Sequence, residues 1–289
     1  MSAVKELTIN AQDGYVLGAT LYEPEPYERT HNVSVQINSA TGTPRGYYDR
    51  FALYLAESGF RVLTYDYRGT FGSKAGNVRT DPSSMRDWGE KDFAAVLAWF
   101  YESNPENKIV SIGHSIGGTL MGLAPNNTLI TSAINVATPT AYWRYWSGLT
   151  KYERLIQWYL LVPLIVNTVG YVPSQFAGGA LPRGVALEWA RWGRHAEFVV
   201  DEHGRPLHEG FKRFNRPLLF YSFTDDEFAP PAAVDAMRDL YSNAIIEHKV
   251  FKPADWGMRS IGHFTFFRKW TPQSVWRQTV KWIASTTES

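Results

Sequence analysis

The sequence predicts an α/β protein with a mostly parallel central sheet of about eight strands, helices on both faces and a helical, aromatic-rich insertion. Three observations predict this class. Nearly continuous apolar runs alternate with segments of helical periodicity, which is typical of strands buried on both faces. The alternation lapses over residues 141–206, where aromatic side chains gather. One strand runs directly into a helix at residues 111–120, through a joint that contains three glycines.

The chain opens with a predicted β-hairpin over residues 6–24. Asp13 and Gly14 form its turn, because an Asp-Gly pair adopts the tight turn that joins antiparallel strands. The later strands are short apolar runs between turn residues. They cover residues 32–38, 60–67, 108–115, 130–139, 217–223 and 245–253.

Helical periodicity marks three longer segments outside the insertion. Residues 47–59 form a helix that Gly59 ends, and residues 274–286 form the last helix of the chain. Residues 84–103 also form a predicted helix, with one apolar face that must be buried. That face carries Trp88, Phe93, Val96, Leu97 and Phe100.

These elements divide the chain into one core and one insertion. Residues 1–140 and 207–289 form the two parts of the core, and residues 141–206 form a helical cap between them. Within the cap, residues 155–172 are apolar but are interrupted by polar and helix-breaking residues. Because a membrane span needs about 20 nearly uninterrupted apolar residues, this stretch is predicted to line a pocket or to pack on the core. Contact with a membrane surface stays a minor alternative.

The composition narrows the functions that the chain can have. The net charge of +1 gives no basis for binding nucleic acid. The chain has no cysteine, which excludes disulfides, thiolate zinc sites and a cysteine nucleophile. The N-terminal residues are polar and lack the apolar core of a signal peptide, so we expect a cytoplasmic protein. No cofactor and no metal are expected, and the oligomeric state is left open.

The joint at residues 111–120 matches the G-x-S-x-G pattern of a nucleophile elbow, a sharp turn between strand and helix that exposes a serine. Gly113 and Gly117 are needed for room, because a Cβ at either position would meet neighbouring backbone. Ser115 is therefore a candidate nucleophile, and the backbone N–H of Ile116 is placed to bind the reacting oxygen. The pattern by itself is common, so it needs partners elsewhere in the chain.

An acid and a histidine follow the serine in the chain order that this motif requires. Asp225 and Asp226 follow one predicted strand, and His263 follows the next. Both groups are therefore expected at the carboxyl ends of strands, where open α/β sheets place their sites. His248 lies inside a strand pattern and is the weaker candidate for the base. His114, next to the serine, is expected to pack or to form a structural hydrogen bond.

This combination resembles the α/β-hydrolase superfamily, in the branch of serine esterases, monoacylglycerol-lipase-like and serine-aminopeptidase-like proteins. It is most similar to bacterial proteins described as predicted α/β hydrolases, and the resemblance extends over nearly the whole chain. In that family the acid usually lies four residues before a proline, which selects Asp226, with Pro230, over Asp225. The motifs that carry the resemblance are "DGYVLGATLYEP" (13–24), "DYRGTFGS" (66–73), "GHSIGG" (113–118), "DDEFAP" (225–230) and "GHF" (262–264).

One segment departs from the family pattern. Family members often have His-Gly after the third strand, before a residue of the oxyanion hole, whereas this chain has "NSATGT" at residues 38–43. The second oxyanion N–H is expected from Ala40 or Thr41, since a backbone donor needs no particular side chain. In the motif at 66–73, Arg68 and Ser73 are expected to hold the loop rather than to touch substrate.

Together these residues predict a serine hydrolase with the triad Ser115, His263 and Asp226. The expected substrate is a small carboxylic ester or thioester of an apolar acyl group, cleaved through an acyl-enzyme that water resolves. Two alternatives stay open: an acyltransferase or peptidase that uses the same triad, and a non-catalytic ligand-binding homologue. The cap residues expected to line the pocket are Tyr142, Trp143, Trp146 and Trp189.

Overall fold

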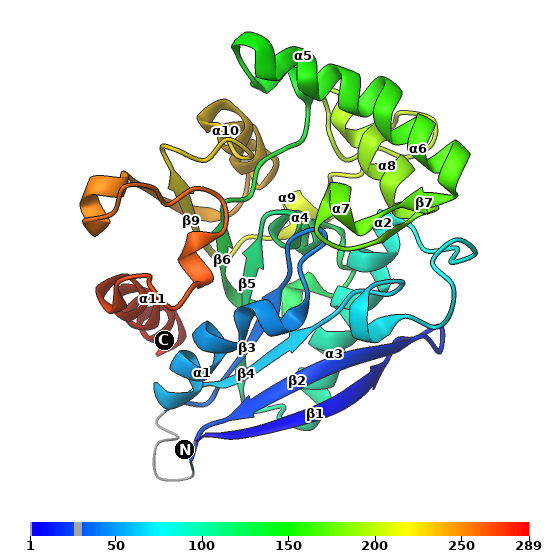
Figure 1. Cartoon of the computed structure of the whole chain (residues 1–289). Helices are drawn as coiled ribbons and strands as arrows, with labels where there is room; N and C mark the ends of the chain where they lie inside the picture. Colours follow the sequence, from blue (N-terminus) through cyan, green and yellow to red (C-terminus); the bar gives the residue numbers. More distant parts are fainter. Residues whose placement is uncertain (1, 26–30, 289) are drawn as a thin grey trace.

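The eight predicted strands form one sheet, in the order β1-β2-β4-β3-β5-β6-β9-β10 (Figure 1). The computed structural model describes residues 2–25 and 31–288. β1 pairs with β2 and β2 pairs with β4 in antiparallel fashion, and the other pairs of this sheet are parallel. The strands are β1 (Ala3–Asn10), β2 (Val16–Glu23), β3 (Val33–Asn38), β4 (Arg61–Tyr65), β5 (Lys108–His114), β6 (Ile130–Val136), β9 (Pro217–Phe223) and β10 (Ile245–Phe251). The predicted mostly parallel sheet is confirmed.

Strand burial follows position in the sheet. Every residue of β3 and β4 is buried, whereas the edge strands β1 and β10 keep several exposed positions. This explains why the central strands are continuous apolar runs in the sequence. Several predicted strands end earlier than expected, among them β4 and β6. β4 stops at Tyr65, before the loop that begins with Asp66, and β6 stops at Val136, because Ala137 has a positive φ of 49°.

Helices cover both faces of the sheet (Figure 1). On one face, α1 and α11 contact each other through the rings of Phe51 and Trp276, whose centroids lie 5.3 Å apart. On the other face, α4 packs against α9 and against the segment at residues 88–93. The hydroxyl of Tyr241, the residue after α10, donates to the Gly118 carbonyl in α4 at 2.6 Å. The core helices are α1 (Asp49–Glu57), α2 (Met85–Asp87), α3 (Ala94–Ser103), α4 (Ile116–Leu123), α9 (Glu209–Arg213), α10 (Pro231–Leu240) and α11 (Gln273–Thr287).

The helix predicted over residues 84–103 is present but is not uniform. α2 passes through a wider π-helical segment, η3 (Trp88–Phe93), before α3 begins. The predicted apolar face is fully buried, as expected. The sequence did not indicate that Asp92, within η3, is fully buried as well.

Between β6 and β9 the chain forms a helical insertion beside the carboxyl ends of the central strands (Figure 1). Trp158 anchors it, because its indole N–H donates to the Ala141 carbonyl at 3.1 Å and its ring lies 5.0 Å from that of Trp189. The insertion contains α5 (Gly148–Ile156), η6 (Gln157–Leu161), α6 (Val162–Val169), β7 (Tyr171–Val172), α7 (Ser174–Ala177), β8 (Leu181–Pro182) and α8 (Arg183–Arg194).

The apolar stretch at residues 155–172 lies within these insertion helices. Trp158, Val166 and Val172 of this stretch are buried, while several of its other apolar side chains are exposed. Among the described helices, none combines the length and the apolar character that crossing a membrane requires. The domain boundaries at 140/141 and 206/207 stay a prediction. The outer ends of the predicted core, residues 1 and 289, lie outside the described residues.

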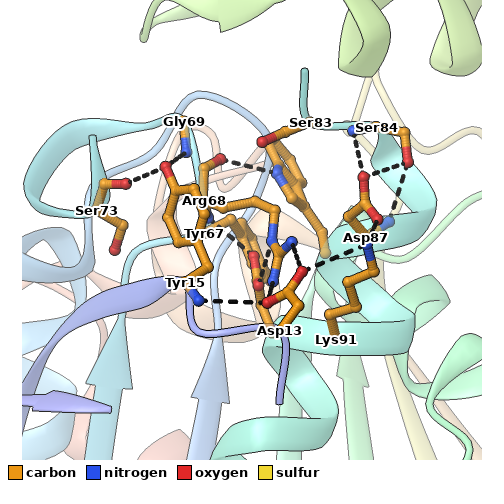
Figure 2. A network of polar contacts seen from close by, with 12 residues as sticks. Asp13, Tyr15, Tyr67, Arg68, Gly69, Ser73, Ser83, Ser84, Asp87 and Lys91 are labelled. Atoms are coloured by element: carbon orange, nitrogen blue, oxygen red, sulfur yellow. Dashed lines mark hydrogen bonds and ion pairs between the residues drawn. The ribbon is translucent and has the colours of Figure 1, made fainter. Parts of the chain in front are cut away.

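A network of ion pairs and hydrogen bonds holds the loop after β4 (Figure 2). The Arg68 guanidinium contacts Asp92 at 2.6 Å and Asp13, in the turn of the hairpin, at 2.7 Å. The Tyr15 hydroxyl donates to the Ser73 carbonyl at 2.7 Å and accepts from a backbone N–H of the same loop at 2.8 Å. Arg68 and Ser73 therefore tie the loop to the hairpin and to η3, in agreement with the structural role expected for them.

Candidate active site

Ser115 occupies a strained turn between β5 and α4. Its φ of 53° and ψ of −119° lie outside the regions that non-glycine residues normally adopt. Such a conformation costs on the order of 1–3 kcal/mol and persists only where surrounding contacts enforce it. Here the Ser115 N–H donates to the Val136 carbonyl at the end of β6 at 2.9 Å. The turn therefore places the serine hydroxyl above the carboxyl ends of two central strands.

The glycines of the turn are required by space. A Cβ added at Gly113 would lie 2.4 Å from the backbone nitrogen of Gly118, and one at Gly117 would lie 2.3 Å from the Asn38 carbonyl oxygen. Backbone cannot move away as a flexible side chain can, so any larger residue would push α4 off the sheet. The sequence suggested that these glycines are needed for room, and the geometry agrees with that reason.

His263 and Asp226 form a buried pair. Nδ1 of the histidine lies 2.8 Å from a carboxylate oxygen of Asp226, and the two side chains are 5% and 0% exposed. The other carboxylate oxygen accepts the N–H groups of Phe228 and Ala229 at 2.8 and 3.0 Å. These bonds fix the carboxylate, which in turn orients the imidazole. Nε2 of His263 has no hydrogen-bond partner among the described residues and is left to face the cavity described below.

Asp225, the alternative acid, has a different role. One of its carboxylate oxygens accepts the Ser260 hydroxyl at 2.8 Å and the backbone N–H groups of Ile261 and Gly262 at 2.8 and 3.2 Å. Burial acts to raise the pKa of Asp225, but these three hydrogen bonds outweigh it and lower the pKa. Asp225 therefore holds the backbone of the loop that carries His263.

The other candidate base lies away from this pair. His248 is on β10, where its ring nitrogens contact the Ser222 hydroxyl at 2.7 Å and the Arg238 guanidinium at 3.2 Å. Burial and the nearby Arg238 charge lower the pKa of His248. Both ring nitrogens of His248 are therefore engaged in contacts with neighbouring side chains, which favours a structural role for this residue.

His114 joins the loop that carries His263 to Tyr48, a connection that the sequence did not reveal. Its Nε2 lies 2.9 Å from the backbone carbonyl of His263, and its Nδ1 lies 2.8 Å from the Tyr48 hydroxyl. A carbonyl only accepts, so Nε2 carries the proton and Nδ1 accepts from Tyr48. Burial, with His263 nearby, lowers the pKa of His114 well below its usual value, which keeps the ring neutral.

The chain of hydrogen bonds continues to the loop after β3. The Tyr48 hydroxyl accepts the backbone N–H of Ala40 at 2.8 Å, and burial raises its pKa so that it stays protonated. Through Tyr48 and His114, the loop at Ala40 is thus joined to the loop that carries His263. No motif in the sequence indicated Tyr48, because its partners lie far away along the chain.

This chain decides between the two residues predicted for the second oxyanion donor. The N–H of Ala40 is already used by Tyr48, so the prediction for Ala40 is corrected. Within the described residues, the N–H groups of Thr41 and Ile116 have no hydrogen-bond partner, and both residues border the same cavity. The N–H groups of Thr41 and Ile116 are therefore the two predicted donors that remain without a partner, and their role in the oxyanion hole stays a prediction.

A cavity of about 780 Å³ lies between the insertion and the sheet. Ser115 and His263 both border it, although no hydrogen bond joins their side chains in the described residues. Its apolar lining includes Trp146, Trp158, Leu161, Val162, Ile165, Trp189, Phe198, Phe228 and Phe264.

The aromatic residues predicted for the pocket divide into two pairs. Trp146 and Trp189 line the cavity, as expected. Tyr142 and Trp143 are not among its lining residues, so the structure does not bring them to this cavity as predicted. They lie in the segment before α5, where their rings contact each other and Tyr145. The pattern of aromatic residues could not show which of them face inward, because this segment has no helical or strand periodicity.

Replacement of Tyr48 by Phe is expected to lower the free energy of unfolding by about 1–3 kcal/mol, because it leaves the buried N–H of Ala40 and Nδ1 of His114 without partners. Urea denaturation followed by tryptophan fluorescence measures this loss. Tyr54→Phe is the matched control, since no hydrogen bond of the Tyr54 hydroxyl is present among the described residues. Equal stability of the two variants would remove the structural role assigned to Tyr48.

Comparison with known proteins places this fold and site in a family. The model of a family described as "Alpha/beta hydrolase family" matches residues 37–268 of this chain. The match covers most of the chain, and the protein therefore belongs to the α/β hydrolase family. The predicted fold is confirmed, and the predicted class, an α/β-hydrolase-fold enzyme, agrees with this family. Among curated proteins, none matches the sequence.

Solved structures share the fold at low sequence identity. A soluble variant of monoglyceride lipase from Saccharomyces cerevisiae, in complex with a substrate analogue, has a TM-score of 0.68 and 14% identity, over 99% of this chain and 96% of that one. An esterase from Pyrococcus furiosus has a TM-score of 0.62 and 13% identity, over 99% and 94%. A serine hydrolase without a lid from Xanthomonas campestris has a TM-score of 0.53 and 15% identity, over 99% and 94%.

Proposed function

We propose that the protein is a serine hydrolase that cleaves a carboxylic ester or thioester of an apolar acyl group. The observation that carries the proposal is the buried pair of His263 and Asp226, on a cavity that also receives Ser115 from its strained turn. The apolar lining of the cavity favours an apolar acyl group. In this proposal, residues 141–206 act as a cap that supplies much of that lining.

The first half of the reaction forms the acyl-enzyme. Ser115 Oγ attacks the carbonyl carbon while Nε2 of His263 takes its proton, and the carbonyl electron pair moves onto the oxygen. The N–H groups of Thr41 and Ile116 stabilise that oxyanion. The tetrahedral intermediate then collapses: the bond to the leaving alcohol or thiol breaks, and His263 returns the proton to it. Substrate binding is expected to draw the serine and the imidazole into hydrogen-bond contact.

The second half releases the acid. Water attacks the acyl carbon, His263 takes a proton from it, and the same two N–H groups hold the second oxyanion. Collapse breaks the bond to Ser115 Oγ, which recovers its proton from His263. Asp226 keeps Nδ1 protonated throughout and stabilises the imidazolium that forms in each half. Bond formation and proton transfer balance without a cofactor.

Activity-based labelling tests the proposal. Wild-type protein is expected to react covalently with a fluorophosphonate probe, and Ser115→Ala is expected to abolish labelling and to lower kcat for 4-nitrophenyl esters by about 10⁶-fold. Gel fluorescence and intact mass spectrometry measure the labelling. Labelling of Ser115→Ala, or its absence from the wild type, would contradict the proposal and favour a non-catalytic homologue.

A pair of histidine variants tests the assignment of the base. His263→Ala is expected to abolish turnover, because it removes the proposed acceptor of the Ser115 proton. His248→Ala is the matched control and is expected to keep most of the activity, since His248 contacts Ser222 and Arg238 outside the cavity. Steady-state kinetics on one 4-nitrophenyl ester compares the two variants. The reverse result would mean that the base is misassigned.

A further inference from the structure

Arg154 is a partly buried arginine that lacks the carboxylate partner of three more deeply placed arginines in the described residues. Arg45 pairs with Asp66, Arg61 with Glu23 and Arg68 with Asp92, so each of these guanidinium groups has a carboxylate partner. Arg154 is half-buried on α5 at the wall of the cavity, yet no described carboxylate lies within ion-pairing distance of it. Burying a cation without an anion costs free energy unless another group compensates.

The contacts that Arg154 does make all belong to the cavity. Its guanidinium lies over the rings of Trp146 and Phe228, 5.6 and 5.3 Å from their centroids, and it donates to the side-chain oxygen of Gln157 at 2.6 Å. These three neighbours also line the cavity. Contacts with the two rings and with Gln157 restrict the orientation of the guanidinium, and no hydrogen bond of its Nη2 is present among the described residues.

One N–H group of Arg154 is an unsatisfied donor. Nε of Arg154 is buried and has no hydrogen-bond partner among the described residues. An unmet buried donor on a charged group is costly, and an anion bound in the cavity would give the guanidinium the charge partner at ion-pairing distance that it lacks. The charges of Glu153 and Glu227 act on Arg154, and Glu153 also borders the cavity, but both acids are exposed to solvent and neither lies within ion-pairing distance of the guanidinium.

The position of Arg154 relates this donor to the reacting groups. Phe228 contacts both: its ring centroid is 5.3 Å from the Arg154 guanidinium and 5.3 Å from the His263 ring centroid. Arg154, Phe228, His263 and Ser115 all border the same cavity, so a substrate whose carbonyl meets Ser115 can extend along Phe228 toward Arg154. A carboxylate on a short chain is the group tested below.

We infer that Arg154 forms an anion-binding subsite of the cavity, so that the preferred substrates are esters that carry a carboxylate close to the scissile bond. This inference rests on the proposed hydrolase function for its catalytic readout. The carboxylate can belong to the acyl group or to the leaving group, and the experiment below separates the two. The aromatic lining continues to bind the apolar remainder of the substrate.

The test compares matched charged and neutral esters. On the acyl side, mono-4-nitrophenyl glutarate is compared with 4-nitrophenyl pentanoate, in which a methyl group replaces the carboxylate. On the leaving-group side, 4-carboxyphenyl pentanoate is compared with its 4-carbamoylphenyl analogue. Wild type is expected to prefer the charged member of one pair, and Arg154→Gln is expected to lower kcat/KM for that member by about 10- to 100-fold. The neutral members should change by less than about 3-fold.

Two further variants exclude a packing effect. Arg154→Lys keeps the charge and is expected to retain part of the preference. Arg194→Gln is the matched control, because Arg194 also lies over an aromatic ring, that of Tyr159 at 5.5 Å, but is not a lining residue of the cavity. It should leave every ratio unchanged. Equal losses on charged and neutral esters in Arg154→Gln, or no preference in either pair, would overturn the inference.

Calorimetric binding separates this inference from the proposed function. Ser115→Ala protein, which cannot turn over, is titrated with mono-4-nitrophenyl glutarate and with 4-nitrophenyl pentanoate. The charged ester is expected to bind about 10-fold more weakly when Arg154→Gln is added to Ser115→Ala. If the wild type hydrolyses none of the esters but this difference is present, the subsite stands and the hydrolase proposal fails. If hydrolysis is present and the difference is absent, the subsite fails alone.

Discussion

Asp226→Asn is expected to lower kcat by about 10³- to 10⁴-fold while leaving the fold intact. The carboxylate of Asp226 accepts Nδ1–H of His263 at 2.8 Å and the N–H groups of Phe228 and Ala229 through its other oxygen. An amide has only one acceptor atom, so it can satisfy the backbone or the imidazole but not both. The histidine then adopts the wrong tautomer or orientation for taking the proton of Ser115. Single-turnover kinetics with a 4-nitrophenyl ester measures the loss.

The neighbouring acid provides the control for this variant. Asp225→Asn is expected to lower kcat by less than about 10-fold, because an amide oxygen can still accept the bonds from Ser260, Ile261 and Gly262. Circular dichroism should show both variants folded. Equal losses in the two variants would mean that the charge of this loop matters and that the Asp226–His263 contact does not. A larger loss in Asp225→Asn would exchange the two assignments.

Arg68→Ala is expected to lower the free energy of unfolding by about 3–5 kcal/mol at pH 8, the usual effect of removing one partner of a buried ion pair. Arg68 is the ion-pair partner of Asp92, whose side chain is fully buried, and it also reaches Asp13 in the hairpin turn (Figure 2). Burial raises the pKa of Asp92 to about 7, and the charge of Arg68 opposes this rise. Without Arg68, a carboxylate would be buried with no cation beside it.

The pH dependence of this defect follows from the same pKa. A group whose pKa is higher in the folded state contributes most at low pH, and its contribution is lost as the pH rises through the folded-state value. Without Arg68 the pKa of Asp92 rises further, so the defect of Arg68→Ala should be smaller at pH 5 than at pH 8. Urea denaturation at both values measures it, with Arg205→Ala, in an exposed ion pair, as the control. A defect that is independent of pH would show that Asp92 is not its cause.

Much of the fold could be predicted because its signals are local. The strand predicted at 217–223 has those bounds in the structure, and the helix predicted at 274–286 differs by one residue at each end. In both segments the apolar pattern reflects the faces that are buried. The predicted helix at 84–103 shows the limit of the pattern, because its π-helical segment contains Asp92, whose ion pair with Arg68 in a distant loop leaves no local signal.

The candidate site was only partly predictable, for the same reason. The turn at Ser115 is specified by neighbouring glycines, so its sequence pattern is sufficient to locate it. The family register selected Asp226, but the separate role of Asp225 depends on backbone N–H groups more than thirty residues away. The use of the Ala40 N–H by Tyr48 left no trace in the sequence. The unpaired charge of Arg154 left no trace in the sequence either, because ion pairing is a property of the folded chain.

The amino-acid sequence by itself determined the alternation of strands and helices, the glycine-rich turn that bears Ser115 and the chain order of serine, acid and histidine. Each of these depends on backbone conformation and on the spacing of nearby residues. Only the tertiary structure decided which carboxylate meets His263, which N–H groups remain free, which aromatic rings face the cavity and that Arg154 has no partner. Those features arise from contacts between segments far apart in the chain, whose geometry exists only once the sheet and the insertion have packed together.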